Sequence, residues 1–177
     1  MPLPTLRLEL LGGFRLLRDG RLVERLPNQR QQQILAFLVL HVGDGPIPRQ
    51  RLAGSLWPDS TDAQALTNLR RELHQLRDVW PEVDRLVDAP SRTLAWRDLP
   101  DVQVDLILFD QAAARALDGD RTALLDAARL YRGDLLPDSG GEWIDADRDR
   151  RRDRATRVLA RLIAALETER EIGRAHV

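Results

Sequence analysis

The pattern that most constrains the fold is a capped amphipathic helix over residues 62–80. Large apolar residues recur there at three- and four-residue steps, which places them on one helix face: Leu66, Leu69, Leu73, Leu76 and Trp80. Three residues at its start have side chains that can cap a helix: Ser60, Thr61 and Asp62. A helix with a continuous apolar face must pack against other elements, so the segments around it decide the fold.

A second, shorter helix is predicted four residues upstream. The segment RQRLAGSLW (49–57) follows Pro48 and ends before Pro58, and prolines at these places mark helix boundaries. Before it, NQRQQQILAFLVLHVG has a polar start at Asn28, a dense apolar run and a stop at Gly43, which predicts a buried helix. A short helix, a tight link and a longer capped helix are typical of a helix-turn-helix.

Strands are predicted on both sides of these helices. Residues 6–26 alternate apolar and polar side chains and contain two glycine turns, which predicts a small antiparallel meander. Beyond the long helix, DRLVDAPSRTLAWRD predicts two short strands around a turn at residues 89–92. Strands, three helices and a terminal hairpin together predict an α+β winged helix-turn-helix domain over residues 1–98.

All elements after Pro100 are predicted to be helical. Three helical patterns, VDLILFDQAAARAL, DRTALLDAARLYRG and EWIDADRDRRRDRATRVLARLIAALE, are separated by Gly119 and by residues 137–141. Paired helices of similar length are typical of tetratricopeptide-like stacks, which need about three repeats to stand alone. We therefore expect residues 102–170 to be the start of an all-α tetratricopeptide-like domain, cut short. The final EIGRAHV (171–177) matches the translation of a common sequencing adapter, and we expect it to be an artefact.

Composition excludes several kinds of site. The chain has no cysteine, which rules out disulfides, zinc–thiolate sites and cysteine nucleophiles. The histidines His41, His74 and His176 lie in different predicted segments, so no metal site is expected. No apolar run approaches the roughly 18 residues of a membrane span, and Met1–Thr5 does not resemble the start of a secretory signal. We expect a cytoplasmic protein with no membrane partner.

Catalytic motifs are missing as well. Ser139-Gly140-Gly141 lacks the Lys-Ser or Lys-Thr pair of a phosphate loop, and no Gly-x-Ser-x-Gly elbow occurs. Alternating acids and arginines on the last helix are explained by ion pairs at three- and four-residue spacing: Asp145, Asp147, Asp149, Arg148, Arg150, Arg151 and Arg152. We expect no enzyme activity and no cofactor.

The polar face of the 62–80 helix carries side chains that can contact DNA bases. Stepping about 100° per residue from Leu69 places four of them opposite the apolar face: Thr67, Asn68, Arg71 and Gln75. In the major groove, Asn and Gln pair with adenine, Arg pairs with guanine, and a threonine methyl packs on thymine. The alternative explanation is that this face is polar only because it is solvated.

Further candidates are expected at the phosphate backbone and in the wing. The formal net charge of −1 provides no long-range attraction to DNA, so locally placed arginines, which make up all 27 basic residues, must provide it. The candidate phosphate contacts are Arg30, Arg49, Arg51, Arg70 and His74, and the candidate wing contacts are Arg92 and Thr93. Trp57 and Trp80 lie on apolar faces next to prolines and are expected to be packing anchors.

Several motifs taken together resemble one family of bacterial regulators. They are LRLELLGGFRLLRDGR, RQRLAGSLWPD, LRRELHQLR, VDLILFDQA, and LYRGDLLPD followed by EWIDADRDRR, and they cover nearly the whole chain. The chain resembles the antibiotic-regulatory-protein (SARP) type of transcriptional activator. That family combines an OmpR/PhoB-like winged helix with a bacterial transcriptional activator domain (BTAD).

The resemblance implies a sequence-specific transcriptional activator that binds double-stranded promoter DNA with helix 62–80. It also implies a homodimer at direct repeats, recruitment of RNA polymerase, and protein contacts through the helical domain. The Gly-Tyr pair that family members carry before the last strand is replaced by Ser91-Arg92-Thr93-Leu94. Two alternatives stay open: a protein-interaction module without DNA binding, favoured by the weak net charge, and the front end of a larger ATPase-containing regulator.

Overall fold

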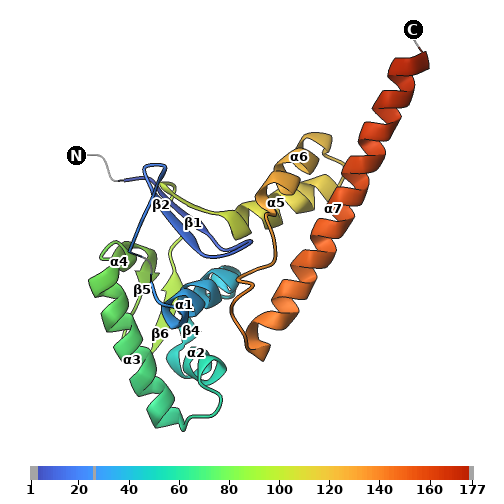
Figure 1. The fold of residues 1–177 in the computed structure, drawn as a ribbon. Coiled ribbons are helices and arrows are strands. Elements are labelled where there is room, and N and C mark those ends of the chain that lie inside the picture. The colour runs from blue at the N-terminus through green and yellow to red at the C-terminus, as the bar shows by residue number, and fades with distance from the viewer. Residues whose placement is uncertain (1–3, 26, 176–177) are drawn as a thin grey trace.

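The computed structural model describes residues 4–25 and 27–175 (Figure 1). The expectations for Met1–Leu3, His176 and the end of the 171–177 segment fall outside these described residues. The strands are β1 (Leu6–Glu9), β2 (Arg15–Arg18), β3 (Arg21–Leu22), β4 (Ile47–Pro48), β5 (Val87–Asp88), β6 (Thr93–Trp96) and β7 (Val102–Val104). The helices are α1 (Gln29–Leu40), the 3-10 turn η1 (Val42–Asp44), α2 (Arg49–Leu56), α3 (Asp62–Val79), α4 (Val83–Leu86), α5 (Asp105–Leu117), α6 (Arg121–Leu130) and α7 (Glu142–Ala175).

Strand β1 lies inside a four-stranded sheet ordered β3-β2-β1-β7. It pairs antiparallel with β2, as the meander prediction requires, and parallel with β7, where Leu8 faces Val104. The prediction that every element after Pro100 is helical is therefore wrong for residues 102–104. The free edge of β1 provides hydrogen-bond partners for this short apolar segment, and a pairing across so much sequence leaves no local signal.

The three helices of the predicted helix-turn-helix follow in order. A capping box starts α1, because the Asn28 side chain accepts a hydrogen bond from the Gln31 backbone N–H and the Gln31 side chain accepts one from the Asn28 backbone N–H. Thr61 is the residue that caps α3, with its hydroxyl accepting from the Gln64 backbone N–H. The apolar face of α3 is buried as predicted, apart from the half-buried Leu66.

A second sheet, ordered β4-β6-β5, packs beside these helices. Strands β5 and β6 form the hairpin predicted around residues 89–92. Two details differ from the prediction: residues 83–86 form the short helix α4, and β4 pairs with β6 immediately before α2 begins. Because β4 pairs with the first residues of β6 and runs directly into α2, the start of α2 lies beside the turn of the hairpin.

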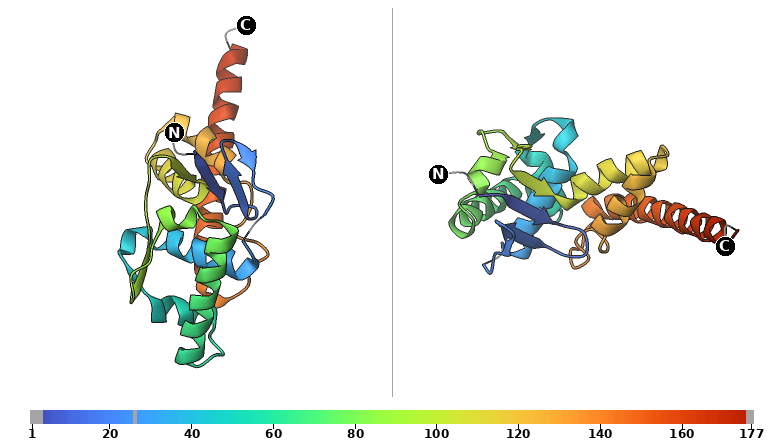
Figure 2. Two further views of the ribbon diagram at one scale, coloured as in Figure 1. Left: turned by 90° about the vertical axis from the view of Figure 1, so that its left-hand side faces the viewer. Right: turned by 90° about the horizontal axis from the view of Figure 1, so that it is seen from above.

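The chain thus has a mixed α/β region (residues 4–104) followed by a helical region (residues 105–175). Helices α5 and α6 pack on each other and on α7, which extends past both of them (Figure 2). The predicted pairs along α7 are present, among them Arg148 with Asp145 and Arg150 with Asp147. Several α7 arginines also contact residues outside the helix: Arg151 and Arg154 bind Asp110 of α5, and Arg152 binds Asp134 of the loop before α7. No helix in the described ranges is both long and apolar enough to span a membrane.

Candidate nucleic-acid interface

A groove of about 930 Å³ lies between α3, the start of α2 and the β5–β6 hairpin, and we call it the hairpin groove. Its floor is apolar and includes three leucines of α3, of which Leu66 is half-buried and Leu69 and Leu73 are buried. Its rim carries four arginines from three elements: Arg49, Arg70, Arg77 and Arg92. The described residues therefore gather positive charge here although the whole chain is nearly neutral.

Arg49 is held in the groove by the hairpin. Its guanidinium donates to the backbone carbonyls of Pro90, at 3.0 and 3.1 Å, and of Ala89, at 3.2 Å, and its own backbone N–H donates to the Arg92 carbonyl at 3.0 Å. Burial, followed by the charges of Arg77 and Arg70, lowers the pKa of Arg49. Guanidinium groups that repel one another in this way favour a bound anion.

The other three arginines of the rim differ in their partners. Arg77 Nε lies 2.7 Å from Asp84 Oδ1 of α4. Among the described residues, neither Arg70 nor Arg92 has a carboxylate within 4.0 Å, and both are exposed. Positive charge at the groove is therefore only partly compensated.

The outward face of α3 is exposed as the sequence predicted. Thr67, Arg71, His74 and Gln75 are exposed and Asn68 is half-buried. Their contacts are local: the Thr67 hydroxyl donates to the Ala63 carbonyl, and Asn68 Oδ1 accepts from Gln64 Nε2, both at 2.9 Å. Arg71 lies 3.6 Å from Glu72, and His74 lies 3.9 Å from Asp78. These weak contacts leave their polar groups available to a ligand.

None of the four predicted base contacts lines the hairpin groove. Gln75 lines a smaller hollow beside the start of α1, together with Arg25 and Asn28. Asn68 precedes Gln75 by two helical turns and so shares that flank. Arg70, predicted as a phosphate contact, instead lines the hairpin groove. The predicted base contacts on α3 therefore lie outside the hairpin groove, whereas this predicted phosphate contact lies in it.

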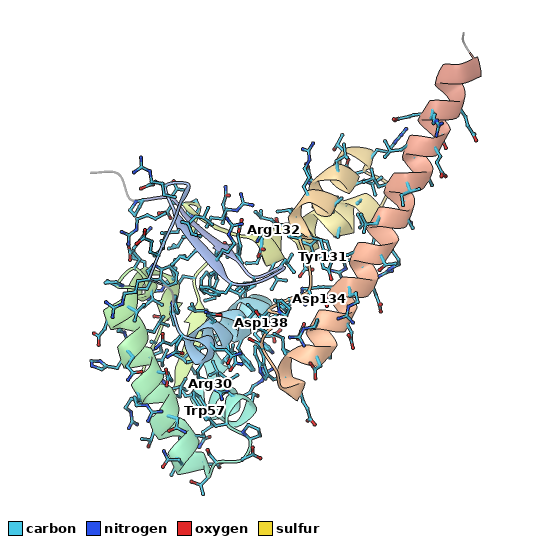
Figure 3. All side chains as sticks on the ribbon, viewed as in Figure 1. Arg30, Trp57, Tyr131, Arg132, Asp134 and Asp138 are labelled. Carbon is cyan, nitrogen blue, oxygen red and sulfur yellow. The ribbon has the colours of Figure 1, made fainter. Side chains whose placement is uncertain are left out.

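Arg30 does not join the other candidate residues. Its guanidinium donates to the Leu56 carbonyl at 2.6 Å and to Gln33 Oε1 at 2.9 Å, and lies 4.9 Å from the Trp57 ring centre (Figure 3). These contacts give Arg30 a structural role at the end of α2. Trp57 is half-buried and Trp80 is buried, as expected for packing anchors. Arg51 is exposed on α2 and does not line the hairpin groove.

Arg77 and Gln50 line the hairpin groove but were not among the residues predicted from the sequence. The sequence did contain a signal for Arg77, because it follows Arg70 by seven residues, the spacing that also separates Leu73 from Leu66. Residues seven apart on a helix lie on the same face, so Arg77 is expected beside Arg70 just as Leu73 lies beside Leu66. Among the described residues, no group of three or more His, Cys, Asp or Glu side chains is placed to hold a metal ion.

Comparison with known proteins identifies a shared fold. No protein-family model matches the chain, and no curated protein matches it. A solved structure that does match is EmbR of Mycobacterium tuberculosis in complex with a low-affinity phosphopeptide, with a TM-score of 0.59 and 22% sequence identity. The match covers 92% of this chain and 44% of the EmbR chain. The chain therefore shares its fold with less than half of that protein.

Proposed function

We propose that this protein is a SARP-type, sequence-specific DNA-binding transcriptional regulator of the bacterial cytoplasm. In this proposal the α/β region is a winged helix-turn-helix, α3 enters the major groove and the β5–β6 hairpin is the wing. The observation that carries the proposal is the hairpin groove, where four arginines lie beside the exposed face of α3. A shared fold with EmbR is consistent with it.

Sequence-specific DNA binding needs two kinds of contact, one to phosphates and one to base edges. Arginines bind phosphates at any sequence and set the position of a protein on the duplex. In this proposal Arg49, Arg70, Arg77 and Arg92, which line the hairpin groove, make these contacts. Base discrimination needs Asn, Gln, Arg or Thr side chains at the bottom of the major groove. The exposed Thr67 and Arg71, with the half-buried Asn68, supply such groups on α3.

The helical region has the role of a BTAD in this proposal. It contacts protein partners, with RNA polymerase as the expected one for an activator, and contributes to a homodimer at repeated sites. Three large apolar side chains of α7 are exposed, namely Leu159 (44%), Ile163 (56%) and Leu166 (52%). Apolar side chains exposed along one helix are typical of protein contact surfaces. The same observation favours the second candidate, a protein-interaction module that does not bind DNA.

The deciding experiment selects binding sites from a random duplex library with the whole 177-residue chain. A fragment ending at residue 98 is unsuitable, because it lacks β7, which pairs with β1. We expect an enriched motif and an affinity that falls steeply with salt. The variant with both Arg49→Ala and Arg70→Ala should lose binding. Absence of enrichment, with no binding even at low salt, would favour the protein-interaction module.

The matched control carries Arg129→Ala and Arg157→Ala. Both residues are exposed arginines of the helical region, on α6 and α7, so the net charge changes equally. We expect this control to bind DNA within about twofold of the unchanged chain, because charges beyond the Debye length of roughly 10 Å are screened. Equal losses in the two double variants would show that binding depends only on total charge, and would contradict a site at the hairpin groove.

A further inference from the structure

The ion pair between Arg77 and Asp84 stands out among the contacts of the hairpin groove. Arg77 belongs to the rim of the groove, whereas Asp84 belongs to α4 and does not line it. The two side chains are 40% and 64% exposed, and Arg77 Nε lies 2.7 Å from Asp84 Oδ1. An exposed pair of this kind contributes little to folding stability. It nevertheless pairs one of the four arginines of the rim with a negative charge.

We propose that Asp84 occupies the place of a DNA phosphate on Arg77. In this proposal Arg49, Arg70 and Arg77 form a binding site for one phosphodiester group of the duplex, and Asp84 is its built-in competitor. The inference rests on the proposed function and adds to it a residue that sets the affinity for DNA. Asp84 acts through Arg77 and does not itself contact DNA.

The geometry of the three arginines supports a single-anion site. Arg49 is fixed by the hairpin carbonyls of Ala89 and Pro90, and the charges of Arg77 and Arg70 act on it. Three arginines from two helices thus line one groove. Carboxylate and phosphate oxygens accept the same charge-assisted hydrogen bonds from arginine, so a phosphate arriving at this site must compete with Asp84 for Arg77.

The exposure of the pair makes this competition reversible. Because the Asp84 carboxylate is already largely solvated, separating it from Arg77 has only a small free-energy cost. DNA can therefore displace Asp84 without disturbing the core. Because a phosphate contact carries no sequence information, Asp84 lowers the affinity for all duplexes alike. When DNA displaces Asp84, the freed carboxylate attracts a cation again, which offsets part of the counterion release from the phosphate. Once Asp84 is replaced this offset is gone, so binding releases up to one more net counterion and the affinity becomes more sensitive to salt.

The test measures binding of the whole chain to its selected duplex and to an unrelated duplex over a range of salt concentrations. Asp84→Asn is expected to tighten binding to both duplexes by roughly two- to fivefold and to steepen the salt slope by up to about 0.9. The control is Asp88→Asn, which removes the same charge from another exposed pair, Asp88 with Arg97 at 2.6 Å. Neither residue of that pair lines the groove. Equal effects of the two substitutions would overturn the proposal.

A double-mutant cycle isolates the role of Arg77. If Asp84 acts through Arg77, adding Asp84→Asn to an Arg77→Gln variant changes the affinity for DNA no more than the Asp88 control does. Tighter binding in the Arg77→Gln background would show a general charge effect and overturn the inference. A cooperative thermal unfolding transition would show that each variant is folded. We expect one in every case, because the side chains of Arg77 and Asp84 are both exposed.

Two further outcomes distinguish failure of this inference from failure of the proposed function. If the unchanged chain binds its duplex and Asp84→Asn binds it no better, only this inference fails. If no variant binds any duplex, the proposed function fails with it. Inorganic phosphate in place of chloride, at equal ionic strength, is expected to weaken DNA binding only slightly. Strong inhibition that disappears in Arg77→Gln would assign the site to free phosphate instead of the DNA backbone.

Discussion

The carboxylate of Asp105 accepts a hydrogen bond from the backbone N–H of Leu10 at 2.8 Å, across 95 residues of sequence. Its second oxygen accepts from the Leu11 N–H at 3.0 Å, and Arg132 Nη2 lies 3.6 Å away. Asp105 is 1% exposed and begins α5, whereas Leu10 follows the end of β1. One buried side chain therefore fastens the helical region to the sheet of the α/β region.

Replacing this carboxylate should destabilise the fold. In Asp105→Asn the amide NH₂ has to face one of the two backbone N–H donors, which leaves a buried donor without an acceptor. We expect the free energy of unfolding to fall by about 1 to 3 kcal/mol, measured by urea denaturation. Asp126→Asn, at an exposed position on α6, should change it by less than about 0.5 kcal/mol. A similar loss in both variants would contradict the structural role of Asp105.

Asp105 should also make the free energy of unfolding decrease as pH rises. Burial raises the pKa of Asp105, and the hydrogen bonds from Leu10 and Leu11 and the charge of Arg132 offset this only in part. The folded chain therefore holds this proton more tightly than the unfolded chain, whose Asp pKa is about 3.9. The resulting stabilisation is full below that pH and is lost as pH rises through the folded pKa. The stability difference between wild type and Asp105→Asn should accordingly shrink as pH rises from about 4. Urea denaturation at several pH values tests this, and a widening difference would refute it.

Gly12 is predicted to be intolerant of a side chain. Its φ is +81°, and a Cβ there would lie 3.1 Å from the carbonyl carbon and oxygen of Arg132. Gly12→Ala should therefore lower the free energy of unfolding by at least about 1 to 2 kcal/mol. Gly54→Ala is the matched control, because Gly54 lies inside α2 and a Cβ there meets nothing within 4 Å. That control should raise stability by up to about 1 kcal/mol. Equal responses to the two substitutions would argue against the close approach at Gly12.

Tyr131 should ionise only at strongly alkaline pH. Burial, followed by its 2.8 Å hydrogen bond to Asp134 and the charge of that carboxylate, raises the pKa of Tyr131 to about 12. Because it is the only tyrosine of the chain, ultraviolet absorbance of tyrosinate follows it directly. Asp134→Asn should lower the midpoint, because it removes a negative charge and leaves a neutral, weaker acceptor. A wild-type midpoint near the ordinary value of about 10 would show that Tyr131 is not held against Asp134.

Substitutions on α3 should distinguish contacts to bases from contacts to phosphates. Arg71→Ala is expected to lose about 1 to 3 kcal/mol of discrimination at one base pair, because Arg71 lies on the exposed face. Arg70→Ala, in the hairpin groove, should weaken binding to every duplex alike and reduce the salt slope by about 0.9. Binding to the selected and to unrelated duplexes measures both effects. Equal losses of specific and non-specific binding in both variants would contradict the assignment.

The elements that could be predicted from the sequence are those specified by residues close together in the chain. The cap at Asn28, the cap at Thr61 and the hairpin turn at residues 89–92 are each encoded within a few residues, because caps and turns satisfy neighbouring backbone groups. Strand β7 could not be anticipated in this way. Its three residues precede a strong helical pattern, and they are a strand because β1 offers a free edge.

For the candidate site, periodicity in the sequence determined which face of α3 is buried and which is exposed. Only the tertiary structure decided which flank of that exposed face meets the hairpin: it brought Arg70 and Arg77 together with Arg49 and Arg92, left Gln75 on the other flank and placed Arg30 against Trp57. The physical reason is the range of the forces involved. Burial of an apolar stripe follows from the spacing of residues along one helix, whereas the convergence of charges from separate elements depends on how those elements pack.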